Sequence, residues 1–391
     1  MIYNEVCGDT LSMLGFGTMR LPLLENGSID EAQVQQMVDY AMENGVNYFD
    51  TAYPYHEGES ERVIGRALKK YPRESYRLAT KYPGHQVASS YNPAEIFEKQ
   101  LEKCGVEYFD YYLLHNVYEN SLPVYMDAQW GILDYFKKQK ELGRIRHLGF
   151  SSHGSVEVLE KFLDYCGGSM EFCQLQLNYL DWTLQNGAEK YELLCRRGVP
   201  VWVMEPLRGG KLAKLPEEQM ETLQALRAEE TAAGWAFRFL QGWGNIEMIL
   251  SGMSNFEQMQ QNVATFDNYE PLADYEKDLL LDIAETMKDS VPCTACRYCT
   301  KGCPMGLDIP LMLEIYNELR MAPNVNASMR LDLMPAEKQP SACIACGACS
   351  GICPQKLEIP KLLADLSERM KQLPSWLEIS RQREEAAKRN G

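Results

Sequence analysis

Eight cysteines in the carboxy-terminal part of the chain form two runs with the same spacing, Cys-x2-Cys-x2-Cys-x3-Cys-Pro. The first run contains Cys293, Cys296, Cys299 and Cys303, and the second contains Cys343, Cys346, Cys349 and Cys353. The matching continues past the cysteines as far as Pro310 and Pro360, and every matched position is offset by the same 50 residues. An internal duplication is the simplest explanation.

This spacing is typical of bacterial proteins that hold two 4Fe-4S clusters, in which the fourth cysteine of each run binds the other cluster. We therefore expect one cluster on Cys293, Cys296, Cys299 and Cys353, and the other on Cys343, Cys346, Cys349 and Cys303. Structural zinc usually takes separated Cys pairs or Cys/His mixtures, and disulfides need an oxidising compartment. Neither alternative explains the duplicated spacing.

Composition bounds the class of protein. The chain has 391 residues and a net charge of -16, which argues against nucleic acid as a partner because nucleic acid requires clustered Lys and Arg. It contains no apolar run of membrane-spanning length and does not begin with an export signal, so we expect no membrane partner. The remaining cysteines fit reduced thiols in a cytoplasmic protein, where they act as small core side chains. These are Cys7, Cys104, Cys166, Cys173 and Cys195.

Short apolar runs alternate with helical patterns through most of the chain, which indicates eight β/α units. The expected strands are Leu14–Met19, Tyr48–Ala52, Tyr76–Tyr82, Tyr111–His115, His147–Ser151, Phe172–Asn178, Val199–Met204 and Met248–Met253. The expected helices between and after them are Glu31–Asn44, Gly58–Lys70, Pro93–Cys104, Ala128–Leu142, Ser155–Tyr165, Ala188–Arg197, Glu217–Ala228, Ala232–Trp243, Phe256–Phe266 and Tyr275–Lys288. The pattern predicts an α/β fold, a (β/α)8 TIM barrel over residues 1–290.

The cysteine runs are predicted to lie in a second, small and mainly helical domain over residues 291–372. Its expected helices, Pro310–Met321 and Pro360–Met370, each begin with an acidic residue and proline, as helix amino-terminal ends prefer. Residues 373–391 are predicted to form a charged tail.

Catalytic residues in such barrels lie at the carboxyl ends of the strands. Four polar candidates stand there: Asp50 after the second strand, Tyr55 in the following loop, Lys81 after the third strand and His115 after the fourth. A single one of them could be an ion-pair partner or a core aromatic. Four at strand ends favour a catalytic site.

Several spaced motifs in order resemble the aldo/keto reductase family over essentially the whole of residues 1–290. They are Leu14-Gly15-Phe16-Gly17-Thr18-Met19-Arg20, Asp50-Thr51-Ala52 with Tyr55, Gly58-Glu59-Ser60-Glu61, Lys81, His115, Gly143-Arg144-Ile145-Arg146-His147-Leu148-Gly149 and Ser151. The resemblance implies reduction of a small carbonyl, or oxidation of an alcohol, with NADP or NAD.

The resemblance also implies roles for the four candidates. Tyr55 would be the general acid, and Lys81, paired with Asp50, would lower the pKa of the tyrosine. His115 would orient the carbonyl by hydrogen bonding. Tyr53 is a nearby rival, but the family spacing favours Tyr55.

The same comparison predicts the cofactor-binding residues, and some of them depart from the family pattern. The nicotinamide carboxamide would lie near Ser151 and Gln174, with Ser152 where the family usually has Asn. Met204 stands where an aromatic side chain usually stacks on the nicotinamide. The remaining expected cofactor contacts are Pro206, Leu207, Arg208, Ser251, Gly252, Gln258 and Asn262, and the segment 251–258 contains no basic residue for a 2′-phosphate.

The two predicted halves handle electrons differently. Each cluster passes one electron, whereas a nicotinamide delivers two as a hydride, so a converter such as a flavin would be needed for direct exchange. No flavin motif is visible in the sequence. The predicted function is an oxidoreductase whose clusters exchange electrons with a ferredoxin or flavodoxin. The alternatives are clusters that only brace the small domain, an electron-transfer protein in which the barrel is a docking scaffold, and a flavin-dependent variant of the enzyme.

Overall fold

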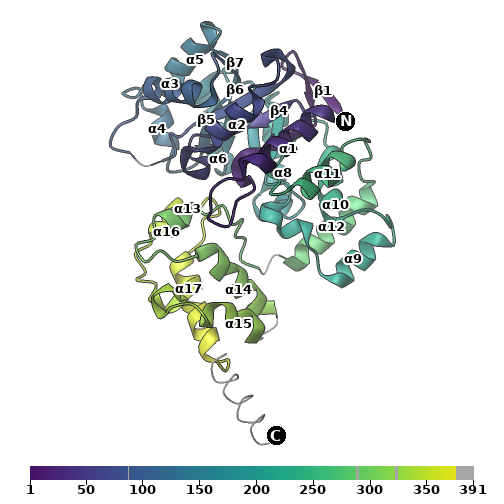
Figure 1. The fold of residues 1–391 in the computed structure, drawn as a ribbon, viewed down its shortest axis with the longest axis vertical. Helices are drawn as coiled ribbons and strands as arrows, with labels where there is room; N and C mark the ends of the chain where they lie inside the picture. The colour runs from purple at the N-terminus through teal and green to yellow at the C-terminus, as the bar shows by residue number, and fades with distance from the viewer. Residues whose placement is uncertain (87, 288–289, 322–324, 376–391) are drawn as a thin grey trace, which may run out of the picture. The chain divides into compact units, whose positions relative to one another are not determined.

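The computed structural model describes residues 1–86, 88–287, 290–321 and 325–375 (Figure 1). The chain divides into two compact units, Met1–Ile283 and Ala284–Gly391, and the division falls within helix α12 (Asp274–Met287). No helix in the described part of the chain is both long enough and apolar enough to cross a membrane.

The first unit is a closed barrel of eight parallel strands in the order β10-β3-β4-β5-β6-β7-β8-β9, so the predicted barrel is confirmed. The strands are β3 (Leu14–Gly17), β4 (Tyr48–Asp50), β5 (Arg77–Tyr82), β6 (Phe109–Val117), β7 (Ile145–Ser152), β8 (Cys173–Gln176), β9 (Val201–Met204) and β10 (Ile246–Ser251). They appear in the sequence as nearly continuous apolar runs because both faces of a parallel sheet are covered. In β6 every residue is buried.

A hairpin of β1 (Tyr3–Val6) and β2 (Asp9–Ser12) precedes the barrel and was not predicted. Its turn residues Cys7 and Gly8 both have positive φ, 54° and 83°, as a two-residue hairpin turn requires. Val6 and Leu11 pack into an apolar cluster with residues from the beginnings of the barrel strands, among them Tyr48. The hairpin therefore covers the amino-terminal end of the barrel, and the opposite end carries the catalytic candidates.

The helices of this unit surround the strands (Figure 1). The larger ones are α1 (Glu31–Glu43), α2 (Ser60–Leu68), α3 (Pro93–Cys104), α5 (Ile132–Glu141), α6 (Val156–Cys166), α8 (Gly187–Arg196), α9 (Glu217–Gln224), α10 (Ala232–Gln241) and α11 (Phe256–Thr265). Several begin at a capping side chain; Asp30, for example, accepts a hydrogen bond from the backbone N–H of Gln33. Two short helices, α4 (Leu122–Met126) and α7 (Asp181–Leu184), were not predicted.

The second unit is helical and repeats itself. Its helices are α13 (Tyr298–Lys301), α14 (Ile309–Met321), α15 (Val325–Asp332), α16 (Ala348–Ile352) and α17 (Ile359–Lys371). The expected helices from Pro310 and from Pro360 are thus present as α14 and α17, whose bounds differ by the same 50 residues as the cysteine runs. Most of the predicted tail lies outside the described residues.

The backbone supports the duplication residue by residue. Ala295 and Ala345 have φ of 52° and 53°, and both are left-handed although neither is glycine. The two halves share one apolar core in which α14 packs against α17.

Candidate functional site

Three of the four catalytic candidates meet at one ammonium group. Lys81 Nζ donates hydrogen bonds to Asp50 Oδ1 at 2.5 Å, to the carbonyl of Thr51 at 2.8 Å and to the hydroxyl of Tyr55 at 3.2 Å. The ring of His115 lies edge-on to that of Tyr55, with centroids 5.9 Å apart. Asp50, Lys81 and His115 are buried. The four residues that the sequence nominated therefore lie together at the carboxyl end of the barrel.

A strained turn places Tyr55 there. The backbone N–H of Tyr55 donates to the carbonyl of Ala52, and the next residues, His56 and Glu57, have φ of 47° and 61°. The ring of His56 accepts a hydrogen bond from the backbone N–H of Leu21 at 3.2 Å, which ties the turn to the loop after β3. A left-handed conformation at two consecutive non-glycine residues is costly and is often found at functional sites.

Ser60, from the motif after this turn, adds a second anchor. Its hydroxyl lies 2.7 Å from Oγ1 of Thr18 and 3.0 Å from Oγ1 of Thr51, and all three side chains are buried. The hydroxyl cluster joins the ends of β3 and β4 to the start of α2. Ser60 therefore helps to fix the turn that carries Tyr55, while Glu61 of the same motif acts on Lys81 through its charge.

Tyr53 points elsewhere. Its ring lies over Nζ of Lys103, 4.1 Å from the ring centroid, and Lys103 also pairs with the buried Glu61 at 3.3 Å. The geometry therefore favours Tyr55 over Tyr53 as the residue coupled to Lys81.

The direction of the tyrosine pKa differs from the expectation. Burial, and then the carboxylates of Asp50 and Glu205, raise the pKa of Tyr55 well above its usual value, and Arg20 opposes them. Burial also lowers the pKa of Lys81 and raises the pKa of Asp50, because each loses hydration, while their mutual attraction works against both shifts. In this structure Asp50 balances the charge of Lys81, so the expected acidifying effect of Lys81 on the phenol stays a prediction.

His115 is held as a neutral ring. Burial, followed by the proximity of His85 and Lys81, lowers its pKa well below the usual value. Its Nδ1 is buried and has no hydrogen-bond partner in the described part of the chain, and its ring lies 4.4 Å from that of His85. A neutral imidazole here can hydrogen-bond a carbonyl oxygen without adding a charge to the site.

On the neighbouring strands the two expected serines already have backbone partners. Ser151 Oγ accepts from the backbone N–H of Asn116 at 2.8 Å, and Ser152 Oγ donates to the carbonyl of Val117 at 2.7 Å. Both bonds hold the irregular end of β6 against β7, where the pairing register shifts. By contrast, Oε1 of Gln174 is buried and has no hydrogen-bond partner within the described ranges. Such a group fits an amide ligand, which a nicotinamide carboxamide would supply.

The expected cofactor contacts after β9 differ in their burial and in their partners. Met204 and Leu207 are half-buried and Pro206 is buried. The guanidinium of Arg208 is fully buried, and its Nε donates to both carboxylate oxygens of Asp181 at 3.0 and 2.9 Å. Arg208 was expected to contact the cofactor, and in this structure its guanidinium pairs instead with a buried carboxylate.

After β10, the expected cofactor residues bond among themselves. Asn262 donates to Ser251 Oγ at 3.0 Å, and Gln258 Oε1 accepts from the backbone N–H of Ser254 at 2.8 Å. A side chain at Gly252 would lie 3.4 Å from the side chain of Arg20, which crosses this position.

An ion pair beside Tyr55 was not predicted. Arg20 Nη2 lies 3.1 Å from Glu205 Oε1, and both side chains are mostly buried. Glu205 has a φ of 56°, unusual for a residue with a side chain. Arg20 ends the motif that begins at Leu14, but its partner lies 185 residues away, so only barrel closure brings the two together.

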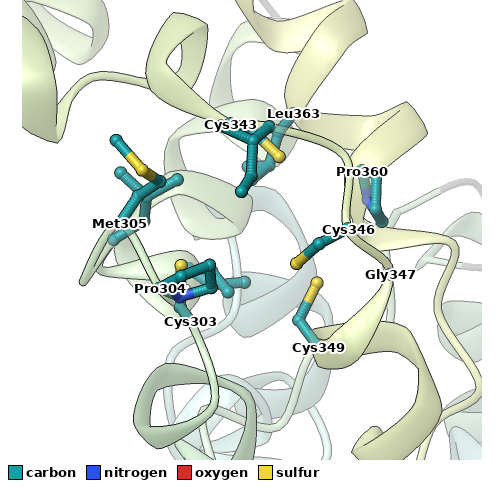
Figure 2. Close-up of a pocket in the computed structure, with 12 residues that line it drawn as sticks. Cys303, Pro304, Met305, Cys343, Cys346, Gly347, Cys349, Pro360 and Leu363 are labelled. Carbon is teal, nitrogen blue, oxygen red and sulfur yellow. The ribbon is translucent and has the colours of Figure 1, made fainter.

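The eight cysteines of the runs form two sets of four. Cys303, Cys343, Cys346 and Cys349 line one hollow (Figure 2), and Cys293, Cys296, Cys299 and Cys353 line another. Figure 2 shows the sulfur atoms of Cys346 and Cys349 pointing toward one another. Each set thus contains three cysteines of one run and the last cysteine of the other, the same division that the spacing predicts for crossed ligation.

The walls of these hollows suit clusters of iron and sulfide. Their other lining residues are mainly apolar, among them Leu363 in one and Leu313 in the other. Burial raises the pKa of the Cys299 thiol, and nearby Cys296, Cys293 and Cys353 add to that effect, so this site disfavours bare thiolates. Bound iron would compensate the negative charges of the thiolates, because a metal ion stabilises the deprotonated form of a coordinating thiol.

Comparison with known proteins agrees with both units. Residues 13–285 match the aldo/keto reductase family, and residues 292–357 match the 4Fe-4S dicluster domain. The chain is 26% identical over 328 residues to the NADH-specific methylglyoxal reductase of Escherichia coli (strain K12), covering 71% of this chain and 96% of that protein. It is 25% identical over 289 residues to the L-galactose dehydrogenase of Arabidopsis thaliana, covering 68% and 86% respectively.

A solved structure shows the likeness in fold. The holo form of an aldo-keto reductase from Bacillus halodurans matches with a TM-score of 0.58 at 24% identity, over 72% of this chain and 96% of that one.

Proposed function

The chain belongs to the aldo/keto reductase family, and on that premise we propose that it interconverts a small carbonyl and its alcohol with a nicotinamide cofactor. The observation that carries the proposal is the hydrogen bond between Lys81 and Tyr55, with Asp50 behind the ammonium group and the ring of His115 beside the phenol. The family and its dicluster domain make the protein an oxidoreductase.

In this proposal the chain's own residues handle the proton. A bound nicotinamide would supply two electrons to the carbonyl carbon as a hydride. Tyr55 would donate its phenolic proton to the carbonyl oxygen, and the raised pKa of Tyr55 keeps that proton in place at neutral pH. When the proton is donated, negative charge develops on the phenolic oxygen of Tyr55. The ammonium group of Lys81, 3.2 Å away, would stabilise that charge.

Binding of the cofactor is assigned to the strand ends beside this group. The free Oε1 of Gln174 would accept a hydrogen bond from the carboxamide, and Met204 would pack against the nicotinamide ring. Ser251, Gly252, Gln258 and Asn262 would line the far end of the dinucleotide. The segment 251–258 has no Lys or Arg, so we propose no preference between NADH and NADPH from it.

The substrate is proposed only as a class. The E. coli relative is named for reduction of methylglyoxal, a small dicarbonyl, and the Arabidopsis relative for oxidation of L-galactose. Both reactions interconvert a carbonyl and an alcohol, which is the chemistry that the four residues can support.

We further propose that the cysteine-lined hollows hold two 4Fe-4S clusters that link the reaction to one-electron carriers. Two clusters together hold two electrons, the number that a hydride carries. The ligands would also require a reducing compartment, so a cytoplasmic location is proposed with them. A flavin would be the converter if electrons pass directly between clusters and nicotinamide.

An anaerobic absorption spectrum of the purified full-length protein tests the proposal. We expect about eight irons per chain, from two clusters of four, and carbonyl-dependent oxidation of NADH or NADPH. Bleaching of the cluster absorption by a nicotinamide or a substrate alcohol would support the electron link. The protein could contain its clusters and yet oxidise neither NADH nor NADPH with any small aldehyde, ketone or dicarbonyl. That result would contradict the proposed carbonyl reduction and favour the electron-transfer alternative.

A further inference from the structure

The two halves of the duplicated unit differ in how they expose their cysteine loops. Residues 294–298 of the first run correspond to residues 344–348 of the second, which we call the second loop. The matched alanines, Ala295 and Ala345, share the same left-handed backbone. A difference in side chains and burial between these loops is therefore not a consequence of different backbone geometry.

The first of these loops is covered and charged. Thr294 is only 3% exposed. Arg297 is exposed, but its guanidinium pairs with Asp308 at 2.9 Å. The loop thus presents a neutralised ion pair and little apolar surface.

The second loop is open and apolar. Ile344, the counterpart of Thr294, is 60% exposed, and Ala345, Cys346 and Ala348 are exposed beside it. The loop carries no charged residue. Cys346 also lines the hollow that Figure 2 displays, so the exposed surface lies directly over one proposed cluster. Contiguous exposed apolar residues around such a group mark an interaction site.

A positive charge lies at the edge of this surface. Lys338 is exposed, and its Nζ donates to the carbonyls of Met305 and Gly306, of which Met305 lines the same hollow as Ile344. Within the described residues Lys338 has no carboxylate partner, unlike Arg297. An acidic partner would complement it.

The distribution of charge along the sequence also favours an acidic partner for the second unit. Residues 284–391 contain 14 Lys and Arg against 13 Asp and Glu, a net charge of +1. The whole chain has -16, so residues 1–283 carry -17. The first unit therefore repels an acidic protein, whereas the second unit does not. An uneven charge distribution of this kind steers how two proteins approach each other.

We propose that the second loop is the docking site of a small acidic one-electron carrier protein, with Ile344 at the centre of the contact and Lys338 on its rim. One electron passes between this protein and the carrier at that contact, and no atom is transferred. The proposal rests on the proposed function, since it names the partner of the clusters. Weak electron-transfer complexes use small interfaces, so one loop and its rim suffice.

Binding of an acidic bacterial ferredoxin to the oxidised full-length protein, measured by titration calorimetry, tests the site. Ile344→Asp should raise the Kd about tenfold or more, because it puts a charge in the apolar centre and repels acidic side chains. Lys338→Glu should weaken binding most at low salt, where charges are least screened. Lys371→Glu, an equal charge change at an exposed residue of α17 that pairs with Glu368, should leave the Kd within about twofold.

Iron content and absorption spectra of each variant establish that the clusters are retained, and Ile344→Ser provides a milder change with a smaller effect in the same direction. Electron exchange with ferredoxin should slow in Ile344→Asp, while exchange with a small dye should not. An unchanged Kd in iron-replete Ile344→Asp, or no binding by the unaltered protein, overturns the site. So does a loss of binding in Arg297→Glu but not in Ile344→Asp, which places docking on the first loop.

A second copy of the chain is the rival occupant. If sedimentation shows a dimer that Ile344→Asp converts to a monomer, the loop is a self-association surface and the carrier proposal is overturned. Carbonyl reduction by the unaltered protein is assayed separately. Its absence would remove the proposed enzymatic function but would not change ferredoxin affinity, so the two failures are distinguishable.

Discussion

Nζ of Lys81 lies 3.2 Å from the phenolic oxygen of Tyr55, and within the described part of the chain that phenol makes no other hydrogen bond. The rival Tyr53 instead covers Lys103 with its ring. The loop after β4 therefore presents two tyrosines to two different lysines. This division makes the catalytic assignment testable with a matched pair of variants.

Tyr55→Phe removes the proposed proton donor and keeps the ring. We expect turnover of carbonyl reduction to fall by roughly 10²-fold or more, with cofactor binding retained. Tyr53→Phe, the matched control, should reduce turnover much less. Steady-state kinetics and nicotinamide titration measure both effects, and a reversed order would show that Tyr53 is the donor.

The pH dependence of reduction follows from the raised pKa of Tyr55. A proton donor is competent below its pKa, and burial keeps this pKa well above the usual value of about 10. The turnover number for reduction should therefore show no loss from tyrosine ionisation between about pH 7 and pH 10. Oxidation of the alcohol needs the deprotonated form and should rise with pH in the same range.

A pH–rate profile in both directions, under saturating substrate, checks this prediction. Tyr55→Phe should lack the dependence in the oxidation direction, since it has no proton to lose. A fall in reduction with a midpoint between pH 7 and 9 that Tyr55→Phe abolishes would contradict the raised pKa, and would show that the bound state restores the acidifying effect of Lys81.

The barrel and the cysteine sets were predictable from the sequence because short-range patterns specify them. Apolar runs mark the strands because these are covered on both faces of the sheet. The 50-residue offset marks the duplicated unit. The hairpin of β1 and β2 was missed because its strands have four residues each and lie partly exposed, which leaves almost no periodic signal.

The pairings that fill the barrel mouth were not predictable in the same way. Arg208 carries the charge expected for a phosphate contact, but its fully buried partner Asp181 lies on a short helix that no capping or periodic pattern announced. Arg20 and Glu205 meet only because β10 lies between β3 and β9 in the closed barrel. Burial, the main cause of the raised pKa of Tyr55, is likewise a property of the folded chain.

Crossed ligation predicts which cluster a cysteine variant damages. Cys353 belongs to the second run but lines the hollow of Cys293, Cys296 and Cys299. Cys353→Ser should therefore damage the first-run cluster more, and Cys303→Ser, its matched counterpart, should damage the second-run cluster. Paramagnetic resonance of the reduced variants distinguishes the two centres. Loss of only the second-run cluster in Cys353→Ser would contradict the crossed arrangement.

The last prediction separates an electron path from a brace. If the clusters conduct, a reduced ferredoxin or an artificial dye should drive or drain the barrel reaction, and this coupling should vanish in the double variant Cys296→Ser, Cys346→Ser. If the clusters only brace the second unit, the same variant should lose thermal stability, because the energy of metal binding contributes to folding in small metal domains. Its nicotinamide-dependent rate per folded molecule should then equal that of the unaltered protein.

We expect the electron path, because two clusters in series form a conduit and exceed what a brace requires. Dye-coupled and nicotinamide-coupled assays on the same preparation, with circular dichroism to count folded molecules, measure both quantities. The bound-flavin content decides the route, since a flavin would convert single electrons into a hydride. Finding no flavin, together with clusters that neither NADH, NADPH nor a substrate alcohol can reduce anaerobically, would leave the conduit without a mechanism and establish the clusters as a brace.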